Sequence, residues 1–593
     1  MLVTDYFKQA VKQLSTVAIV LVLGGCASGV NMLPSLTETT VLSNQQGVVV
    51  AKVINASAYP LPFNQLTIAP KNLNESDKIK PERLQAIDTP LTKSTVFAAP
   101  VNAGSYSLFS LRTFYTRGDY WFSRFAPADA KFGTFEVKPG QVTDLGTIIY
   151  YPKPDKDQYL HTLVRVAEND SGKTLKDYFP YYQYQPEQLL AWNKDERDEE
   201  RQNYFISIAQ NPITYNEKYL APDNSIYFVG KLGVIVKRTA DGEWLIDAVD
   251  TNSDLTSIAQ NQAGDAIVAG NEGRVFIKRA DDEQWQDVSV TTNHDIERVV
   301  IQDNGDLDII ARQETKLIVY RTNINQPNWQ IIASYSTVGG WRDADGNKQV
   351  VVSKDTKKTT NKKPKARRIV NATIEQVNDQ HFIEIVTQSL NSNYVFAEGD
   401  KVTFTYAPNT WQARLTEDEQ PISAVLNAGA TKLGIKYAGF WSWDGRPDYF
   451  RLDNNSQEWI EINTHVKSCK QGTELKGNNC TGGDKPAKAS KKTFNFTSVP
   501  WFYSDLEAVA LVSFSDFNFW TGQSKRETKF VTTSDGGKNW QITDYELPNK
   551  YCTDLIAEAK DYMLLSCKGV SSDFYESYDQ GQTWQHVREQ ESF

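Results

Sequence analysis

The sequence predicts an all-β protein in which a small N-terminal β-sandwich is followed by a seven-bladed β-propeller. Short runs of alternating apolar and polar residues, broken by Gly and Pro, fill most of the 593 residues, and this is the pattern of half-buried strands. The chain is 12% aromatic, and aromatic side chains are enriched in strands. In the C-terminal part a tryptophan recurs at nearly regular intervals, which indicates a repeat architecture.

Charge and composition exclude several classes of function. The 63 Lys and Arg residues are outnumbered by 73 Asp and Glu, which gives a net charge of -10, whereas a general nucleic-acid binder needs a basic surface. Only 5 His are present, so a His-rich metal site is not expected. The sequence therefore predicts no metal, no cofactor and no nucleic-acid partner, while local basic patches remain open.

The N-terminus has the pattern of a bacterial signal peptide at residues 1–25. Lys8 and Lys12 precede an apolar run at 17–23, and a charged region followed by an apolar one is typical of secretory signals. The apolar run is much shorter than the roughly 20 residues that cross a bilayer. A transmembrane helix is therefore not expected.

The end of this segment, Leu23-Gly24-Gly25-Cys26, resembles the lipobox of bacterial lipoproteins. The resemblance implies that Cys26 is acylated and becomes the new N-terminus, and Ala27 matches the outer-membrane pattern of that family. More than one acyl chain gives stable attachment, so residues 26–42 would form a lipidated tether on an outer membrane, facing the periplasm or the cell surface. A chance cysteine near a cleavage site is the alternative.

The remaining cysteines form two local pairs, which fits an exported protein because disulfides persist outside the cytoplasm. Cys552 and Cys567 are equally distant from a turn near 559–560, so they would face each other across a hairpin. Cys469 and Cys480 would close a polar loop. A zinc site is the alternative for four cysteines, but neither pair has the close CxxC spacing of zinc ribbons.

The region 43–152 is expected to form the β-sandwich, with strands at 48–53, 105–113, 120–125, 135–137 and 145–151. Gly and Pro between these runs mark turns. The stretches 103–108 and 135–140 resemble the small immunoglobulin-like or transthyretin-like sandwiches found near lipoprotein anchors. The resemblance implies a spacer without an active site.

Residues 153–202 are expected to form a partly helical bridge. The sequence there becomes rich in Lys, Asp, Tyr and Pro, and Pro186 would occupy the first turn of a helix, where proline is tolerated. The charged run 194–201 would be a solvated helix face.

The region 203–593 is expected to form the propeller. Its recurring tryptophans are Trp244, Trp285, Trp329, Trp411, Trp459, Trp540 and Trp584, separated by 41, 44, 82, 48, 81 and 44 residues. A period in the forties is the length of one four-stranded blade. Seven blades follow if both long intervals contain insertions, and nine follow if they contain complete extra sheets.

Two segments near the C-terminus repeat one motif. Thr533, Asp535, Gly537 and Trp540 share their spacing with Ser577, Asp579, Gly581 and Trp584. The Asp carboxylate can accept backbone N–H bonds across a turn, Gly can adopt a left-handed conformation, and Trp can pack between sheets. The motif resembles the Asp-box of propellers that include sialidases and photosystem II assembly factors, and in that group its Asp is a turn fastener.

The resemblance to sialidases raises the possibility of a glycosidase, which would need an arginine cluster, a Tyr nucleophile and an acid/base Asp. The sequence lacks an Arg-x-Pro motif ahead of the first blade, and Arg446-Pro447 beside Asp444 reads as a surface turn. Neither a nucleophile elbow nor a phosphate loop is evident. Whether the protein is an enzyme stays uncertain; a non-enzymatic role is favoured, and a glycan-binding protein or sialidase-like glycoside hydrolase is the alternative.

Both long intervals contain basic insertions, which gives the sequence its candidate binding residues. Clustered cations can hold an anionic partner, although they can also be solubilising loops. The expected partner is a cell-envelope protein, in particular an outer-membrane one, or else an anionic glycan or lipopolysaccharide. The candidates are Lys357, Lys358, Lys362, Lys363, Lys365, Arg367, Arg368, Lys485, Lys488, Lys491 and Lys492.

Overall fold

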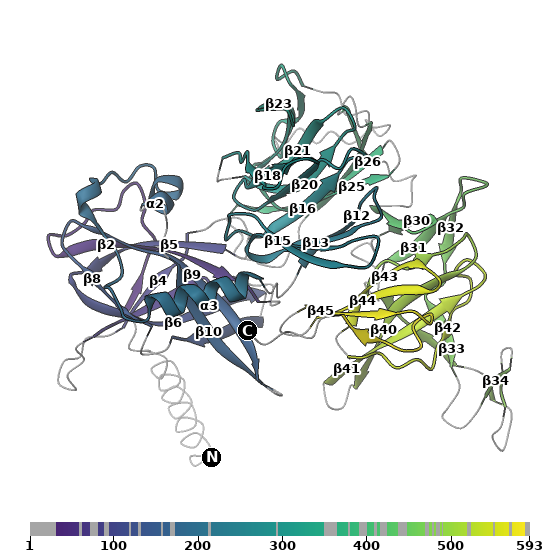
Figure 1. Ribbon diagram of the computed structural model, residues 1–593. Helices are drawn as coiled ribbons and strands as arrows, with labels where there is room; N and C mark the ends of the chain where they lie inside the picture. Colours follow the sequence, from purple (N-terminus) through teal and green to yellow (C-terminus); the bar gives the residue numbers. More distant parts are fainter. Residues whose placement is uncertain are drawn as a thin grey trace, which may run out of the picture.

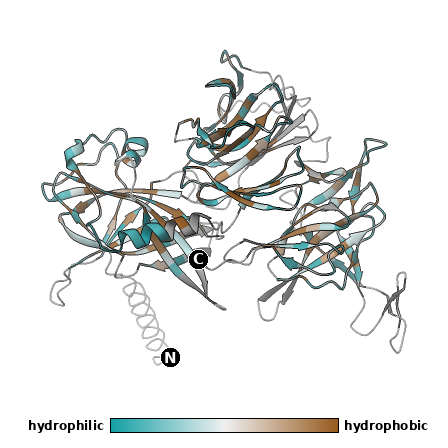
Figure 2. Ribbon diagram, viewed as in Figure 1, coloured by the Kyte–Doolittle hydropathy of each residue, from teal (hydrophilic) through white to brown (hydrophobic). Residues whose placement is uncertain are grey.

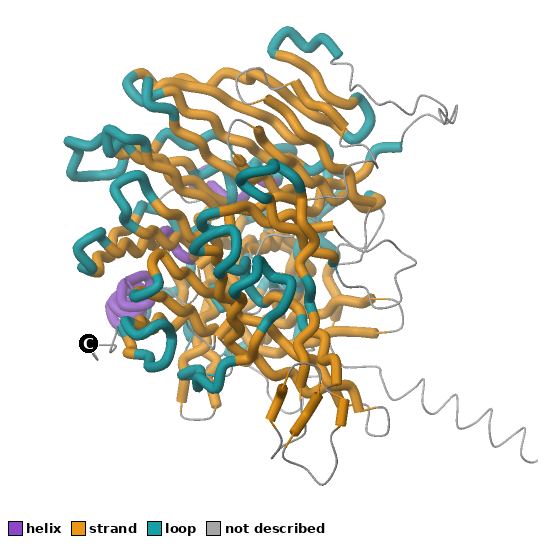
Figure 3. Tube along the Cα trace, turned by 90° about the vertical axis from the view of Figure 1, so that its right-hand side faces the viewer, coloured by secondary structure: helices purple, strands orange, loops and turns teal. Residues whose placement is uncertain are grey.

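The computed structural model shows a predominantly β protein, with an N-terminal unit beside a larger group of sheets (Figure 1). Strands make up most of the described chain (Figure 3). None of its described helices is long and apolar enough to span a bilayer. The structure describes residues 31–587 except 58–61, 72–80, 88–93, 118–119, 129–131, 156–157, 167–171, 211–214, 292–293, 349–364, 378–379, 391–399, 408–411, 416–423, 437–446, 469–473, 477–478, 482–486, 489, 519–522, 550–551 and 569–571.

The N-terminal unit consists of two sheets. The first has the order β1-β4-β3-β6-β7, with β8 pairing with β6, and the second has the order β10-β9-β2-β5, with β11 pairing with β9. The strands are β1 (Asn31–Leu33), β2 (Gln46–Asn55), β3 (Gln65–Pro70), β4 (Glu82–Gln85), β5 (Ser94–Asn102), β6 (Gly104–Arg117), β7 (Tyr120–Pro127), β8 (Thr134–Val137), β9 (Val142–Asp155), β10 (Gln158–Val166) and β11 (Leu189–Leu190).

These two sheets enclose one hydrophobic core. Leu66 and Leu111 from the first sheet pack with Val49 and Phe97 from the second, and all four are fully buried. Successive residues of a strand point to opposite faces, so the alternating apolar residues of each strand are collected in the core. Hydrophobic residues lie along the strands of both parts of the molecule (Figure 2).

The expected tether and the expected domain boundary both differ from the structure. Residues 31–33 form the edge strand β1, which pairs in parallel with β4, and Leu36 is buried against the second sheet. The boundary expected at residue 152 lies inside β9, whose pairing with β10 extends this sheet to Val166. The pairing of β1 with β4 is long-range, and a local sequence pattern does not report it, whereas β9 and β10 form a hairpin that continues the sheet past the expected boundary.

The bridge contains less helix at its centre than expected. Pro186–Gln188 form only a single 3-10 turn, while the α-helices are α2 (Lys173–Tyr178) and α3 (Asp198–Gln210). The run 194–201 is not simply a solvated face, because Arg201 is mostly buried and pairs with Asp195 at 3.0 Å. Asp198 also pairs with Arg165 of β10, so these charges fasten α3 to the N-terminal unit.

Seven sheets of successive antiparallel strands follow in the described chain. The first sheet contains β12 (Tyr215–Leu220), β13 (Ile226–Gly230), β14 (Val234–Arg238) and β15 (Trp244–Ala248), and the second contains β16 (Leu255–Gln260), β17 (Ala266–Gly270), β18 (Val275–Lys278) and β19 (Gln286–Asp287). The third contains β20 (Asp295–Ile301), β21 (Asp306–Gln313), β22 (Lys316–Asn323), β23 (Gln326–Ser336) and β24 (Gly340–Asp343), the fourth β25 (Arg367–Val377), β26 (Gln380–Ser389), β27 (Asp400–Ala407) and β28 (Gln412–Leu415), and the fifth β29 (Ala424–Ala428), β30 (Thr431–Lys436), β31 (Asp448–Leu452) and β32 (Trp459–Ile462). The sixth contains β38 (Asn495–Phe496), β39 (Trp501–Phe502), β40 (Ala508–Asn518), β41 (Gln523–Thr533) and β42 (Gln541–Ile542), and the seventh β43 (Cys552–Ala559), β44 (Tyr562–Lys568), β45 (Ser572–Ser577) and β46 (Gln585–His586).

Consecutive sheets pack against each other, and the seventh packs against the first. Buried apolar clusters join neighbouring sheets along the chain, and β25 and β26 of the fourth sheet contact β29 of the fifth. Phe228 of the first sheet packs with Leu564 and Phe574 of the seventh. The Tyr215 hydroxyl and the Lys218 ammonium both donate to Asp554 of the seventh sheet, at 2.8 and 2.6 Å. The sheets thus form a ring, and among the described residues its closure between the seventh and first sheets is made by side-chain contacts and not by strand pairing.

Each end of this ring has a distinct set of turns. In a meander of four strands the first and third turns lie at one end of the sheet, which we call the turn end. The second turn lies at the other end, together with the connections between sheets, and we call this the crossover end. The N-terminal unit docks at the crossover end. Lys52 pairs with Glu272 at 2.6 Å, both largely buried, and Leu232 packs against Ile54 and Tyr151.

The second basic insertion contains strands and is not a simple loop. Strand β33 (His465–Ser468) pairs with β37 (Ser490–Thr493), and β34 (Glu474–Lys476), β35 (Asn479–Thr481) and β36 (Ala487–Lys488) form a separate small sheet. This small sheet projects from the body of the molecule (Figure 1).

Candidate functional site

The two matched motif turns lie at the turn end, in the sixth and seventh sheets. Asp535 accepts hydrogen bonds from the backbone N–H and the side-chain amide of Asn539, at 2.8 and 2.7 Å. Asp579 accepts them from the backbone N–H and the hydroxyl of Thr583, at 2.9 and 2.6 Å. The preceding hydroxyls of Thr533 and Ser577 accept the backbone N–H of Gly537 and Gly581, respectively.

Both carboxylates are committed to their turns. The hydrogen bonds from Thr583 lower the pKa of Asp579 to about 2. Burial raises the pKa of Asp535, but the hydrogen bonds from Asn539 outweigh it and leave that pKa lowered. A carboxylate held ionised by its own loop is poorly suited to donate a proton near neutral pH, so these residues are structural.

The glycines and tryptophans of the two turns act as the sequence predicts. Gly537 and Gly581 have positive φ angles of 86° and 85°, the left-handed region that favours glycine. Trp540 is buried between the fifth and sixth sheets, and Trp584 packs between the sixth and seventh. In both sheets the motif therefore holds the third turn in a fixed conformation and anchors the edge of the sheet to its neighbour.

The predicted disulfide between Cys552 and Cys567 is present. The two residues are direct partners across β43 and β44, as their equal distance from the turn predicts. Cys26 and Cys469 lie outside the described residues, and of Cys480 only its place in β35 is described.

The nine lysine candidates divide into three groups. Lys357, Lys358, Lys362, Lys363 and Lys485 lie outside the described residues, and Lys488 is placed only as part of β36. Lys365 and Lys491 are exposed. The Lys492 ammonium lies 4.9 Å from the centre of the Phe514 ring.

Arg367 and Arg368 do not belong to a free cationic loop. They begin β25, where Arg367 donates to the Thr387 hydroxyl at 3.0 Å. Arg368 is buried and lies 4.0 Å from Glu314. The expectation was wrong for Arg368 because the basic run continues into a strand whose neighbours supply a carboxylate, which makes burial of a charged side chain tolerable.

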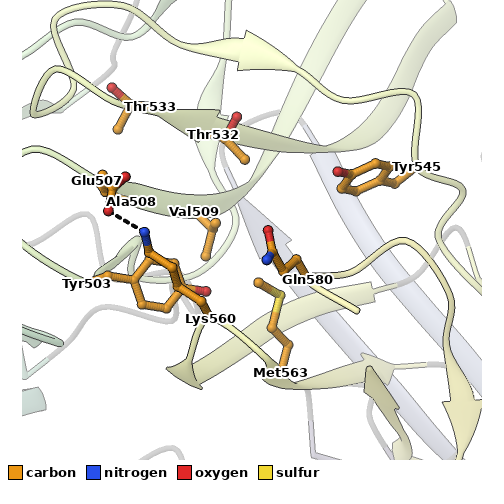
Figure 4. Close-up of a pocket in the computed structure, with 10 residues that line it drawn as sticks. All are labelled: Tyr503, Glu507, Ala508, Val509, Thr532, Thr533, Tyr545, Lys560, Met563 and Gln580. Carbon is orange, nitrogen blue, oxygen red and sulfur yellow. Dashed lines mark hydrogen bonds and ion pairs between the residues drawn. The ribbon is translucent and has the colours of Figure 1, made fainter. Parts of the chain in front are cut away.

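A cavity of about 140 Å³ opens at the turn end between the sixth and seventh sheets. Val509, Met563 and Gln580 point toward its centre, and Tyr503 and Tyr545 lie on opposite sides of it (Figure 4). Its other lining residues are Glu507, Ala508, Thr532, Thr533 and Lys560. The cavity thus has an apolar floor, two aromatic walls and a polar rim.

The polar groups of this cavity differ in their partners. Glu507 and Lys560 form an exposed ion pair at the rim. The Tyr503 hydroxyl is buried and has no hydrogen-bond partner among the described residues, and burial together with the nearby charge of Asp561 raises its pKa. An unpartnered buried hydroxyl is costly, so a ligand that reaches it would regain a hydrogen bond.

Sequence reasoning missed this cavity. Its lining comes from the first turn of the sixth sheet, the end of β41, the segment after β42 that contains Tyr545, and the first and third turns of the seventh sheet, so no single segment contains it. Gln580 is the one lining residue with a feature that could have pointed to the cavity. It occupies a variable position of the second motif turn and has a positive φ of 64°. Such a conformation is uncommon for a residue other than glycine.

Of the remaining sequence candidates, Asp444 and Arg446 lie outside the described residues. The turn at 445–448 is only partly described, with Asp448 opening β31. Within the described residues no cluster of three or more His, Cys, Asp or Glu side chains could hold a metal ion.

By its fold the chain is thus a predominantly β protein, in which consecutive sheets form a ring and an N-terminal unit docks on it. No family model matches the chain, and no curated protein does. Among solved structures, the chain is similar to YCF48 from Cyanidioschyzon merolae, at 13% identity and a TM-score of 0.36 over 63% of this chain and 97% of that one.

Two further solved structures have comparable values. YCF48 bound to D1 peptide is 12% identical, with a TM-score of 0.33 over 62% of this chain and 95% of that one. A polysaccharide lyase of the PL25 ulvan lyase family is 13% identical, with a TM-score of 0.33 over 65% and 94%. At TM-scores this low, the likenesses assign no activity to this chain.

Proposed function

We propose that this protein is a non-enzymatic outer-membrane lipoprotein whose ring is a seven-bladed β-propeller that binds another protein of the cell envelope. In this proposal Cys26 carries the lipid anchor and the N-terminal unit is a β-sandwich spacer. The disulfide between Cys552 and Cys567 supports an oxidising compartment such as the periplasm. The expected lipobox supports the membrane attachment.

The cavity at the turn end is the observation that carries the binding role. Beside its lining residue Glu507, the Leu506 side chain is 54% exposed, and Tyr578, two positions before Gln580, is 57% exposed. Exposed apolar and aromatic side chains around a recess are typical of protein contact surfaces. The docked N-terminal unit contacts the crossover end, so it leaves this surface open.

The basic insertions would add electrostatic attraction at the crossover end. They lie between the third and fourth sheets and between the fifth and sixth, whereas the N-terminal unit contacts the first two sheets. Lys365 and Lys491 are exposed at the borders of these insertions. Binding of an acidic partner there should weaken with salt, because exposed charges are screened.

Crosslinking in native membranes followed by affinity purification tests the proposal and locates the surface. The variants are the substitution pair Leu506→Ser and Tyr578→Ser, and deletions of 354–364 and 469–489, which spare β25 and β37. Leu245→Ser with Ile246→Ser is the control, because these residues are also exposed apolar side chains, on β15. A defined envelope protein lost only from the first pair supports the turn end.

Loss of the same protein only from the deletions would assign binding to the insertions. Capture that is unchanged in every variant would show that neither surface binds it and would contradict the proposal.

Glycan binding is the second candidate function, and the two tyrosine walls of the cavity favour it. Sugar rings pack on aromatic side chains, and Gln580, Thr532 and the rim ion pair offer hydrogen bonds to hydroxyl groups. Glu507 is the only carboxylate lining the cavity, so the paired carboxylates of a typical glycoside hydrolase are not assembled there. Titration with neutral oligosaccharides, comparing the parent chain with Tyr545→Ala, tests this candidate.

A further inference from the structure

The outer face of the first N-terminal sheet is the surface turned away from the shared core. Strand register places one row across it, in the order Met32, Arg83, Thr67, Ser110 and Pro127. A second row contains Gln85, Gln65, Arg112 and Phe125, and Phe114 with Ser123 continues the face beyond it. Phe109 occupies the irregularity that β6 makes against β3.

This outer face exposes large apolar side chains. Met32 is 42% exposed, Phe109 50%, Phe114 37% and Phe125 48%. They come from three strands, and two of them lie in the register rows described above. Thr67 and Ser110 in the middle of the first row are buried, so the exposed side chains lie around a covered centre. Exposed apolar side chains on one face commonly mark an interaction surface.

The same face carries two arginines. Arg112 lies over the Phe114 ring at 5.2 Å and donates to the Ser123 hydroxyl at 3.1 Å. Arg83 donates to the Thr67 hydroxyl at 3.1 Å. Neither arginine forms an ion pair with a described residue, and burial together with the neighbouring charge of Arg112 lowers the pKa of Arg83.

The register rows contain no acidic residue. Glu136 of β8 pairs with Ser105, toward the opposite end of β6 from Arg112. The two guanidinium groups therefore have no carboxylate in their own rows. An anion from outside the chain would give them a partner of opposite charge. Guanidinium groups bind phosphate with two parallel hydrogen bonds.

The position of the expected anchor identifies a source of that anion. Only residues 27–30 separate Cys26 from β1, and an extended chain spans at most about 3.5 Å per residue, or roughly 14 Å in total. An acylated Cys26 would therefore hold β1, the edge of this sheet, close to the headgroups. Met32 of β1 belongs to the outer face, so that face begins where the tether ends.

We propose that the outer face, with Arg83, Arg112, Phe114 and Phe125, rests on the phosphate-bearing surface of the bilayer that holds the anchor. This inference rests on the proposed acylation of Cys26. The arginines bind lipid phosphates, and the phenylalanines enter the boundary between headgroups and acyl chains, as in interfacial membrane proteins. The second sheet, which docks on the ring, then faces away from the membrane.

A depth-sensitive label tests this orientation in the acylated full-length protein. Phe114→Cys carries an environment-sensitive fluorophore, and Leu245→Cys carries the same label on the ring as a control. In vesicles of phosphatidylethanolamine and phosphatidylglycerol, we expect a blue-shifted emission and quenching by a lipid-borne quencher at position 114 only. Equal, aqueous signals at both positions in protein whose acylation mass spectrometry has verified would overturn the proposal.

Sedimentation of the unacylated chain 27–593 with the same vesicles separates this inference from the lipid anchor. We expect measurable binding, and roughly 25-fold weaker binding after Arg83→Gln with Arg112→Gln, since each cation near an anionic surface contributes about a factor of five. Leu245→Ser should leave binding unchanged. No binding, or equal binding by the double variant, would contradict the inference. A lack of acyl chains on Cys26 would contradict only the proposed anchor.

Discussion

The joint between the seventh and first sheets should be the weakest in the ring, and Phe574→Ala tests this. Phe574 is buried, with its ring centre 4.7 Å from that of Phe228 and 5.4 Å from that of Trp244. Neighbouring sheets elsewhere in the ring are also linked by the chain. At this joint the contacts between described residues are made by side chains and not by strand pairing, so losing a large side chain should let the seventh sheet detach locally.

The size of the effect follows from the burial of the ring. Replacing a buried Phe with Ala costs about 3–5 kcal/mol. If this cost falls on opening of the joint, the equilibrium constant for opening rises by about a hundred- to a few thousand-fold, since about 1.4 kcal/mol corresponds to a factor of ten. Phe276→Ala is the control, because Phe276 is equally buried but lies between the first two sheets.

Hydrogen exchange followed by mass spectrometry measures this opening. For Phe574→Ala we expect faster exchange in peptides from 552–587 and in β12 to β14, with the third and fourth sheets unchanged. For Phe276→Ala we expect no selective change in 552–587. Equal acceleration of all sheets in both variants would refute the idea that the joint opens independently.

Three other predictions concern charges and the cavity. Lys52→Ala should leave Glu272 buried without its partner and weaken the contact between the N-terminal unit and the ring by about 3–5 kcal/mol. Small-angle scattering would detect this as separation of the N-terminal unit from the ring. The double variant Lys52→Met with Glu272→Met should restore the compact form. Asp579→Asn should lower the thermal unfolding midpoint at pH values above the ordinary Asp pKa. The difference in midpoint between variant and parent should disappear as pH falls through about 2, where the lowered pKa of Asp579 lies. A difference in midpoint that does not depend on pH would contradict this. Tyr503→Phe should raise stability by about 1 kcal/mol in a denaturant titration, because it removes an unpartnered buried hydroxyl, and a loss of stability would show that the hydroxyl has a partner.

Local patterns in the sequence predicted the strands and turns of the ring well. The β13, β14 and β17 strands are short apolar runs whose pairing partners lie only a few positions away in the chain. The outer strands vary more in length, since β15 has five residues and β19 only two, Gln286–Asp287. An outer strand has one neighbour, so its pairing ends sooner.

Contacts between distant segments were not predictable. The parallel pairing of β1 with β4 joins segments that β2 and β3 separate in the chain, and Lys52 meets Glu272 across 220 positions of sequence. Buried Arg368 lies 4.0 Å from Glu314, a residue of the preceding sheet. The cavity at the turn end likewise combines turns of two sheets, and the period of the repeat does not say which side chains meet there.

The way in which the ring closes also fixes the order in which the chain can complete its fold. Tyr215 meets Asp554 across 339 positions of sequence, and a chain is synthesised from its N-terminus. Until the last sheet is made, the Phe228 side of the first sheet has no cover, and such exposed apolar surface favours aggregation. Protection during synthesis should therefore be needed longest at the first sheet, although it is the first part of the ring to be made.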